Sequence, residues 1–311
     1  MPIPGRDNFQ LSEVGLSQPP APQTYRFADA GREFDPKVRV LLQASIARST
    51  QRAYQTDLDH FLAWGGSVPA SAETVARYLA DHAEILTVAT LARRTVAIGR
   101  AHVIRGFANP AANDLVRIAL RGIRRMYGRP QERVAALTKE QLLAIVSSLN
   151  NSTRDIRDRA LLLIGFAGAF RRSELVSLDC HSIERRPAGI VISIRRSKTD
   201  QEGHGREIAI PSSGGSMCPV AAVDAWLEVA GITEGPIFRT ITRKGDVRPS
   251  RLATEAVALI VKQRARLIGL AVDRYSGHSL RSGFVTSAAM AGIPIWKIKA
   301  SEPKSCLPTI L

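Results

Sequence analysis

The sequence has 311 residues, of which 45% are hydrophobic and 5% aromatic, so it can form ordinary aliphatic cores in two compact domains rather than a fibrous chain. Its 43 lysines and arginines against 28 acidic residues give a formal net charge of +15, which favours a polyanionic partner, nucleic acid first. No apolar run is long enough to cross a bilayer and no signal segment follows Met1, so we expect a cytoplasmic protein. The three cysteines are widely spaced, which predicts reduced thiols rather than disulfides or a zinc site.

The first third of the chain divides into an arm and a helical domain. Residues 1–35 are rich in proline and poor in apolar clusters, which predicts a flexible N-terminal arm. Over residues 36–128 apolar side chains recur at three- and four-residue steps, with Ser49 and Ser71 placed as helix caps. The pattern predicts an all-helical domain.

Two helices of this domain, expected around residues 91–104 and 115–126, are dense in arginine. A charged helix face is usually only a solvated face, but here two helices and the net charge agree, so we expect contact with the DNA backbone. The arginines concerned are Arg93, Arg94, Arg100, Arg117, Arg121, Arg124 and Arg125.

Residues 129–137 follow the helix stopper Gly128 and contain a proline and charges, which is typical of an exposed connection between domains. The second domain, residues 138–311, then opens with Thr138 and Gln141 spaced as a capping box, which predicts a helix from about Lys139. A further helix is expected after Ser152.

The periodicity then changes to that of strands. Residues 190–194 and 207–210 are β-rich and flank a polar, glycine-containing stretch, 198–205, that suits a hairpin loop. Helices follow from Pro219 and over residues 252–267. The second domain is therefore expected to be mixed, with a small sheet.

Five residues of this domain carry the chemistry: Arg171, Glu174, Lys198, His278 and Arg281. Each has an ordinary explanation by itself, as a surface pair, a solvated loop charge or a capping histidine. Together they supply what a phosphoryl transition state needs without a metal ion. Two guanidinium groups can match the non-bridging oxygens, and a lysine and a histidine can move protons.

Short motifs surround these residues and follow one another in a defined order. Residues 168–175 read GAFRRSEL, residues 197–200 read SKTD, and residues 278–281 read HSLR, in that order. With the segment STQRAY at 49–54, they resemble the tyrosine recombinase, or phage integrase, family and particularly its Cre-like members. The resemblance extends over residues 36–299.

The resemblance implies a fold that is mainly α with a small β-sheet. A helical SAM-like core-binding domain (36–128) and a mixed α/β catalytic domain (138–311) would form a C-shaped clamp on double-stranded DNA. Members assemble as tetramers on DNA and need no metal or cofactor. The implied function is site-specific DNA recombination and the integration of mobile DNA.

The resemblance also implies separate roles for the five residues. Arg171 and Arg281 would hold the scissile phosphate, and Lys198 would protonate the departing 5′ oxygen. His278 would act as a general acid or base, while Glu174 would orient neighbouring groups. The proton-transfer roles would each be worth on the order of 10²- to 10⁴-fold in rate.

The sequence departs from the family pattern after Lys299, where no tyrosine follows to attack phosphorus. The last tyrosine, Tyr275, precedes His278, and the thiol of Cys306 has no base placed beside it. Three accounts stay open: a member that binds DNA without cutting it, a coding sequence altered near its end, or a tyrosine received from a partner protomer. The abrupt end of the match favours the altered end and predicts a C-terminally incomplete catalytic domain without an identified nucleophile.

Other functions are weighed against recombination. A non-enzymatic DNA-binding module could occupy recombination sites without cleaving them. A metal-dependent nuclease would need clustered ligands, and Asp179, His181 and Asp200 lack a persuasive ligand spacing. Type IB topoisomerases share the phosphate-binding chemistry, but the size and the helical first domain favour a recombinase.

Overall fold

The computed structural model describes residues 45–130, 134–194 and 205–294, together with Lys37, Leu41 and Trp296. Contacts between Cα atoms divide the chain into two compact units, residues 1–131 and 132–311. This division falls within the predicted connection, residues 129–137. The predicted arm, residues 1–35, lies outside the described residues.

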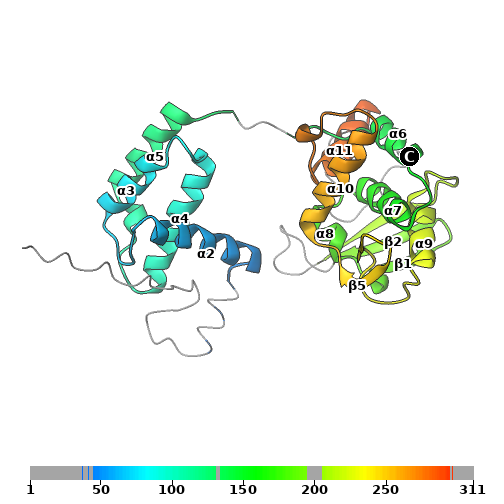
Figure 1. Cartoon of the computed structure of the whole chain (residues 1–311), viewed down its shortest axis with the longest axis horizontal. Helices are drawn as coiled ribbons and strands as arrows, with labels where there is room; N and C mark the ends of the chain where they lie inside the picture. Colours follow the sequence, from blue (N-terminus) through cyan, green and yellow to red (C-terminus); the bar gives the residue numbers. More distant parts are fainter. Residues whose placement is uncertain are drawn as a thin grey trace, which may run out of the picture. The chain divides into compact units, whose positions relative to one another are not determined.

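The first unit is helical throughout its described part, as the periodicity predicts. Helix α2 packs against α4, and α3 and α4 both pack against α5 (Figure 1). The core between them contains Leu58, Phe61, Tyr78, Leu91 and Ile98, each fully buried. The elements are α2 (Arg48–Ala63), α3 (Ala72–Asp81), α4 (Val88–Ile104), a 3₁₀ turn (Pro110–Ala112) and α5 (Asp114–Tyr127).

Two serines were predicted to cap helices of this unit, and one of them does. The Ser71 hydroxyl accepts a hydrogen bond from the Thr74 amide at the start of α3, so this predicted cap is confirmed. The prediction of a cap at Ser49 is wrong. Helix α2 begins at Arg48 because the N–H groups of its first turn donate to the carbonyl of Ala47, which leaves Ser49 inside the helix.

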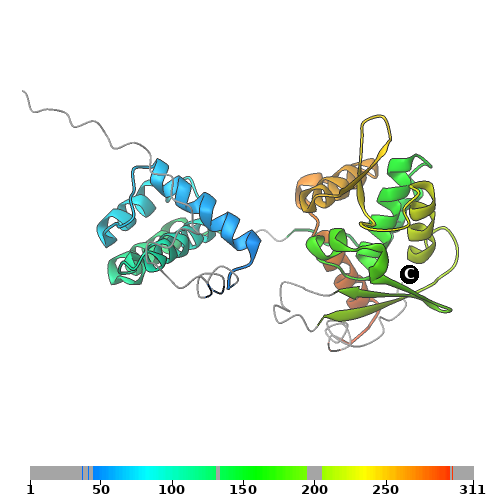
Figure 2. The same ribbon diagram turned by 90° about the horizontal axis from the view of Figure 1, so that it is seen from below.

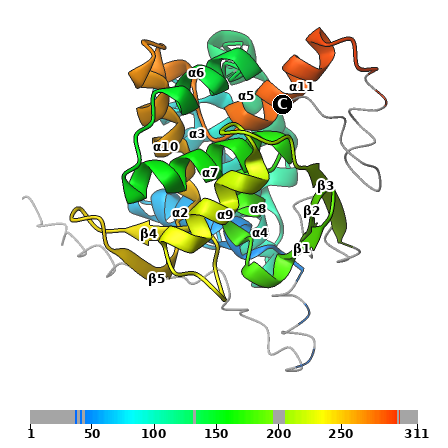
Figure 3. The same ribbon diagram turned by 90° about the vertical axis from the view of Figure 1, so that its right-hand side faces the viewer.

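The second unit combines helices with two antiparallel sheets, as Figures 2 and 3 show from two directions. The three-stranded sheet has the order β1-β2-β3, and the two-stranded sheet β4-β5 lies on another side of the unit (Figure 3). The helices are α6 (Lys139–Ser147), α7 (Thr153–Ala167), α8 (Arg172–Ser177), α9 (Pro219–Val229), α10 (Thr254–Leu267) and α11 (Ser279–Met290), with 3₁₀ turns at Cys180–Ser182 and Val272–Arg274. The strands are β1 (Ile183–Arg186), β2 (Gly189–Ile194), β3 (Arg206–Pro211), β4 (Arg239–Ile241) and β5 (Val247–Arg251).

Alternation of apolar residues gives the larger sheet one buried face. Ile190 pairs with Ile210 and Ile192 with Ile208, and all four side chains are buried. Helix α9 packs against β3 on one side and α7 on the other. Its Trp226 is fully buried and donates its indole N–H to a backbone carbonyl of the core.

The start of the second unit follows the predicted capping pattern. The Gln141 amide donates to the Thr138 hydroxyl, and the Thr138 amide donates to the Gln141 side chain, so both halves of the capping box are present. Ser152 caps α7, and Pro219 is the first residue of α9. The predicted fold class, mainly helical with a small sheet, is confirmed. Within the described ranges no helix is long and apolar enough to span a bilayer.

Candidate functional site

The turn between α7 and α8 places Arg171 at the first turn of a helix. Ala169 in this turn has φ 47°, a left-handed conformation that costs energy for any residue with a Cβ atom. Its carbonyl accepts a hydrogen bond of 2.7 Å from a terminal nitrogen of Arg281 on α11. The strained turn therefore holds two sequence-distant arginines, Arg171 and Arg281, in one region.

Glu174 reaches back from the first turn of α8 to Arg171. One carboxylate oxygen accepts from the Arg171 amide at 2.9 Å, and the other accepts from the Arg171 guanidinium at 2.7 Å. The carboxylate is buried, with 2% of the side chain exposed. Burial opposes its ionisation, but the hydrogen bonds from Arg171 and the charge of Arg206 outweigh it and lower the pKa of Glu174.

The site contains a third arginine, which the sequence analysis did not identify. Arg206, the first residue of β3, donates to Glu174 at 2.7 Å. Its side chain is 10% exposed, and its Nε atom is buried without a hydrogen-bond partner among the described residues. Glu174 is thus shared between two guanidinium groups, that of Arg171 just before α8 and that of Arg206 in β3.

We call Arg171, Arg206 and Arg281, with Glu174 between them, the arginine array. Burial and the positive charges of Arg171 and Arg206 lower the pKa of Arg281, although Glu174 partly opposes this. Three guanidinium groups and one carboxylate leave a formal charge of +2. Because like charges brought together out of water repel, this arrangement favours an anion as its partner.

His278 lies at the edge of the same region. It precedes the first residue of α11, its side chain is exposed, and its amide donates to the Ser276 hydroxyl at 3.1 Å. The side chain of Arg172, at the start of α8, fills the space that a Cβ atom on Gly277 would occupy. This contact brings the His278 turn against α8. Lys198, the remaining predicted residue, lies outside the described residues.

The predicted arginines of α5 form an exposed face on the first unit, opposite the buried Val116 and Ile123. Arg117 has an ion pair with Asp114 in which both side chains are more than half exposed. We call this surface the α5 arginine face; it consists of Arg117, Arg121, Arg124 and Arg125.

The arginines of α4 are divided between surface and core. Arg100 is exposed, and Arg93 is half-exposed while donating two hydrogen bonds to the buried Asp57, at 2.7 and 2.9 Å. Arg94 is buried and donates to the hydroxyl of Tyr78 at 3.0 Å. The expectation that Arg94 contacts DNA therefore needs correction, because its guanidinium group belongs to the core of the helical unit.

Tyr275 also belongs to a core. Its side chain is 6% exposed and packs in the hydrophobic cluster of the second unit. This agrees with a packing role for the tyrosine ring. The residues after Lys299, Cys306 included, lie outside the described residues.

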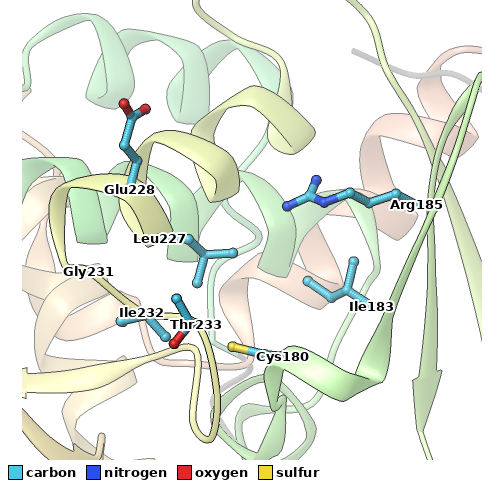
Figure 4. Close-up of a pocket in the computed structure, with 8 residues that line it drawn as sticks. All are labelled: Cys180, Ile183, Arg185, Leu227, Glu228, Gly231, Ile232 and Thr233. Atoms are coloured by element: carbon cyan, nitrogen blue, oxygen red, sulfur yellow. The ribbon is translucent and has the colours of Figure 1, made fainter.

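A pocket of about 490 Å³ opens elsewhere in the second unit, between the start of the three-stranded sheet and the end of α9 (Figure 4). Cys180 and Arg185 line it from the sheet side, and Leu227 and Ile232 line it from the other. None of these residues belongs to the arginine array.

Asp179, considered above as a metal ligand, instead pairs with Arg251 at 2.7 Å, and the described residues contain no cluster of three His, Cys, Asp or Glu placed to hold a metal ion.

A helical unit followed by a mixed unit with small antiparallel sheets is the fold class of known recombinase structures. Residues 135–301 match the model of the phage integrase family, and the chain belongs to this family, the tyrosine recombinases. It is 40% identical to an integrase/recombinase XerD homolog of Selenomonas ruminantium over 83% of this chain and 78% of that protein.

Solved structures agree in fold at low sequence identity. XerH recombinase in a post-cleavage complex with its difH substrate aligns over 86% of this chain and 77% of that chain, with TM-score 0.58 and 14% identity. A lambda integrase tetramer bound to a Holliday junction aligns over 86% of this chain and 72% of that chain, with TM-score 0.55 and 16% identity.

Proposed function

We propose that this protein binds double-stranded DNA in site-specific recombination and that its arginine array holds one phosphodiester of the target. Membership in the phage integrase family supports the process. The complexes named for XerH and lambda integrase support DNA as the partner and an assembly of four protomers.

The observation that carries the proposal is the array itself. The positive charge of Arg171, at the start of α8, lowers the pKa of Arg281 in α11, and the Glu174 carboxylate accepts hydrogen bonds from both Arg171 and Arg206. Two guanidinium groups in this setting can donate to the non-bridging oxygens of a phosphodiester and stabilise the charge that develops when it reacts.

Proton transfer would come from residues beside the array. His278 is exposed at the start of α11 and is therefore open to a substrate, which suits a general acid or base. We assign Lys198 the protonation of the departing 5′ oxygen on the strength of the family resemblance. Glu174 acts by orienting Arg171.

The α5 arginine face would contact the phosphate backbone outside the reacting position. Each phosphate neutralised by an arginine adds about 0.9 to the slope of log affinity against log salt concentration. Replacing Arg121 and Arg125 together by glutamine should therefore lower the slope by about 2 for duplex DNA. Arg94 takes no part because it is buried.

The test begins with selection of bound duplexes from a random pool, followed by measurement of affinity against salt concentration. A matched control replaces Lys262 and Arg266, two basic residues of α10, by glutamine. The proposal requires a smaller slope for the α5 variant and an unchanged slope for the control. Equal slopes in all three proteins would remove the α5 arginine face from the DNA interface.

Strand cleavage is tested separately with a nicked suicide substrate. A covalent protein–DNA adduct that survives denaturation would show cleavage, and peptide mapping would name the nucleophile. Because Tyr275 is buried, we expect Tyr275→Phe to leave any adduct formation intact. Loss of the adduct in a folded Tyr275→Phe variant would contradict that assignment.

A further inference from the structure

Arg206 stands out among the basic residues of the second unit by its position and its partner. It is the first residue of β3, far in sequence from α8, yet it donates to Glu174 at 2.7 Å. Its side chain is 10% exposed, so the interaction is shielded from bulk water.

The net charge of the array depends on Glu174 having two cationic partners, Arg171 and Arg206. Glu174 also accepts two hydrogen bonds from Arg171. With Arg171 as the only cation beside it, Glu174 would form a neutral pair and would cancel the charge that Arg171 offers to a phosphate. With Arg206 as a second cation, the three residues keep a charge of +1, and Arg281 raises the array to +2.

The position of Arg206 has a mechanical consequence as well. Glu174 is held from α8 through Arg171 and from β3 through Arg206, so the carboxylate cannot follow one guanidinium group without breaking the bond to the other. The shared carboxylate therefore fixes where the Arg171 guanidinium lies. The Arg206 Nε is buried and has no hydrogen-bond partner within the described part of the chain, so the guanidinium group is packed against protein rather than solvated.

Resting on the proposed function, we propose that Arg206 is a positioning residue for phosphodiester binding. It compensates the charge of Glu174 and thereby keeps Arg171 oriented and available for a DNA phosphate. Arg206 acts through Glu174 and does not itself need to touch the DNA.

The charge gives a sharp test in which a conservative substitution is compared with a neutral one at the same position. Arg206→Gln lowers the array from +2 to +1, whereas Arg206→Lys keeps it at +2. Affinity for a fluorescein-labelled duplex of mixed sequence is measured on the full chain. We expect Arg206→Gln to bind about tenfold more weakly, on the scale of one charge-assisted hydrogen bond, and Arg206→Lys to bind within about threefold of the unaltered protein.

A matched control separates charge compensation from a loss of folding. Arg264, which is 14% exposed and paired with Asp155 and Asp158, is a matched buried arginine outside the array. Arg264→Gln should lower the melting temperature without the tenfold loss of affinity.

The outcomes distinguish the inference from the proposed function. If Arg206→Lys binds as weakly as Arg206→Gln, or tenfold more weakly than the unaltered protein where Arg206→Gln does not fold, or if a folded Arg206→Gln keeps the affinity of the unaltered protein, the charge-compensating role is overturned. If Arg281→Gln, measured in parallel, leaves affinity unchanged, the array does not bind DNA phosphate and the proposed function itself fails. Loss with Arg281→Gln, loss with Arg206→Gln and retained affinity with Arg206→Lys would establish the role.

Discussion

Replacement of Glu174 by glutamine is expected to destabilise the second unit by about 3 kcal/mol. Removing the charge of a buried ion pair that leaves its partner uncompensated costs about 3–5 kcal/mol. We take the lower end because the Arg171 side chain is 20% exposed and water screens part of its charge. The loss should lower the melting temperature of a unit of this size by about 6–12 °C.

The contribution of Glu174 to the unfolding free energy should also depend on pH. Because the pKa of Glu174 lies below the ordinary value of 4.5, its ionised form adds stability that is complete above pH 4.5 and declines as the pH falls further. The difference in unfolding free energy between the unaltered protein and Glu174→Gln should therefore shrink in acid.

Thermal unfolding followed by circular dichroism measures both effects, with Glu184→Gln as the control. Glu184 forms an ion pair with Arg186 in which both side chains are more than half exposed, so its loss should cost less than about 1 kcal/mol. Equal melting temperatures for the two variants would refute the argument that the buried carboxylate holds the array together.

Three further predictions concern local structure. Asp57→Asn should destabilise the helical unit by about 2 kcal/mol, because Asp57 is buried and Arg93, its bidentate partner, is half-exposed; a chemical denaturation midpoint unchanged by the substitution would contradict this. Burial lowers the pKa of His102, whose neutral ring accepts the Ala70 amide at 2.8 Å, so the helical unit should lose stability as the pH falls below 6.5; a His102→Gln variant with the same acid dependence would argue against His102 as the cause. Thr138→Ala removes one half of the capping box and should cost about 1 kcal/mol in thermal unfolding, whereas a cost near zero would show that the cap is dispensable.

The helices could be predicted because their signals are local. Ser71, Thr138, Ser152 and Pro219 mark helix starts through bonds or backbone geometry within one turn, and the structure confirms all four. The strands β1, β4 and β5 could not be predicted, because β1 and β5 are polar and largely exposed and β4 has only three residues. Pairing with a partner strand, rather than an apolar face, defines them.

The sequence predicted the site residues that belong to short motifs. It did not predict the site residue whose contacts arise only when the chain folds. Arg171, Glu174 and Arg281 belong to motifs that the sequence displays. Arg206 belongs to none, because its role depends on β3 lying beside α8. Arg94 is the opposite case, a residue that the sequence assigned to the DNA interface and the fold buries. It is adjacent to Arg93 in sequence, but a turn of about 100° between neighbouring helix positions places it in the core.

The central claim, that Arg171 and Arg281 hold one phosphodiester, is tested most directly with duplexes in which single phosphates are replaced by neutral methylphosphonates. With the duplex obtained by selection, the unaltered protein should lose about tenfold in affinity at one central position, beyond the losses at backbone contacts. The double variant Arg171→Gln with Arg281→Gln should be insensitive at that position and should keep its sensitivity at every other. If the double variant responds to each replacement as the unaltered protein does, the arginine array does not hold the phosphate and the account is wrong.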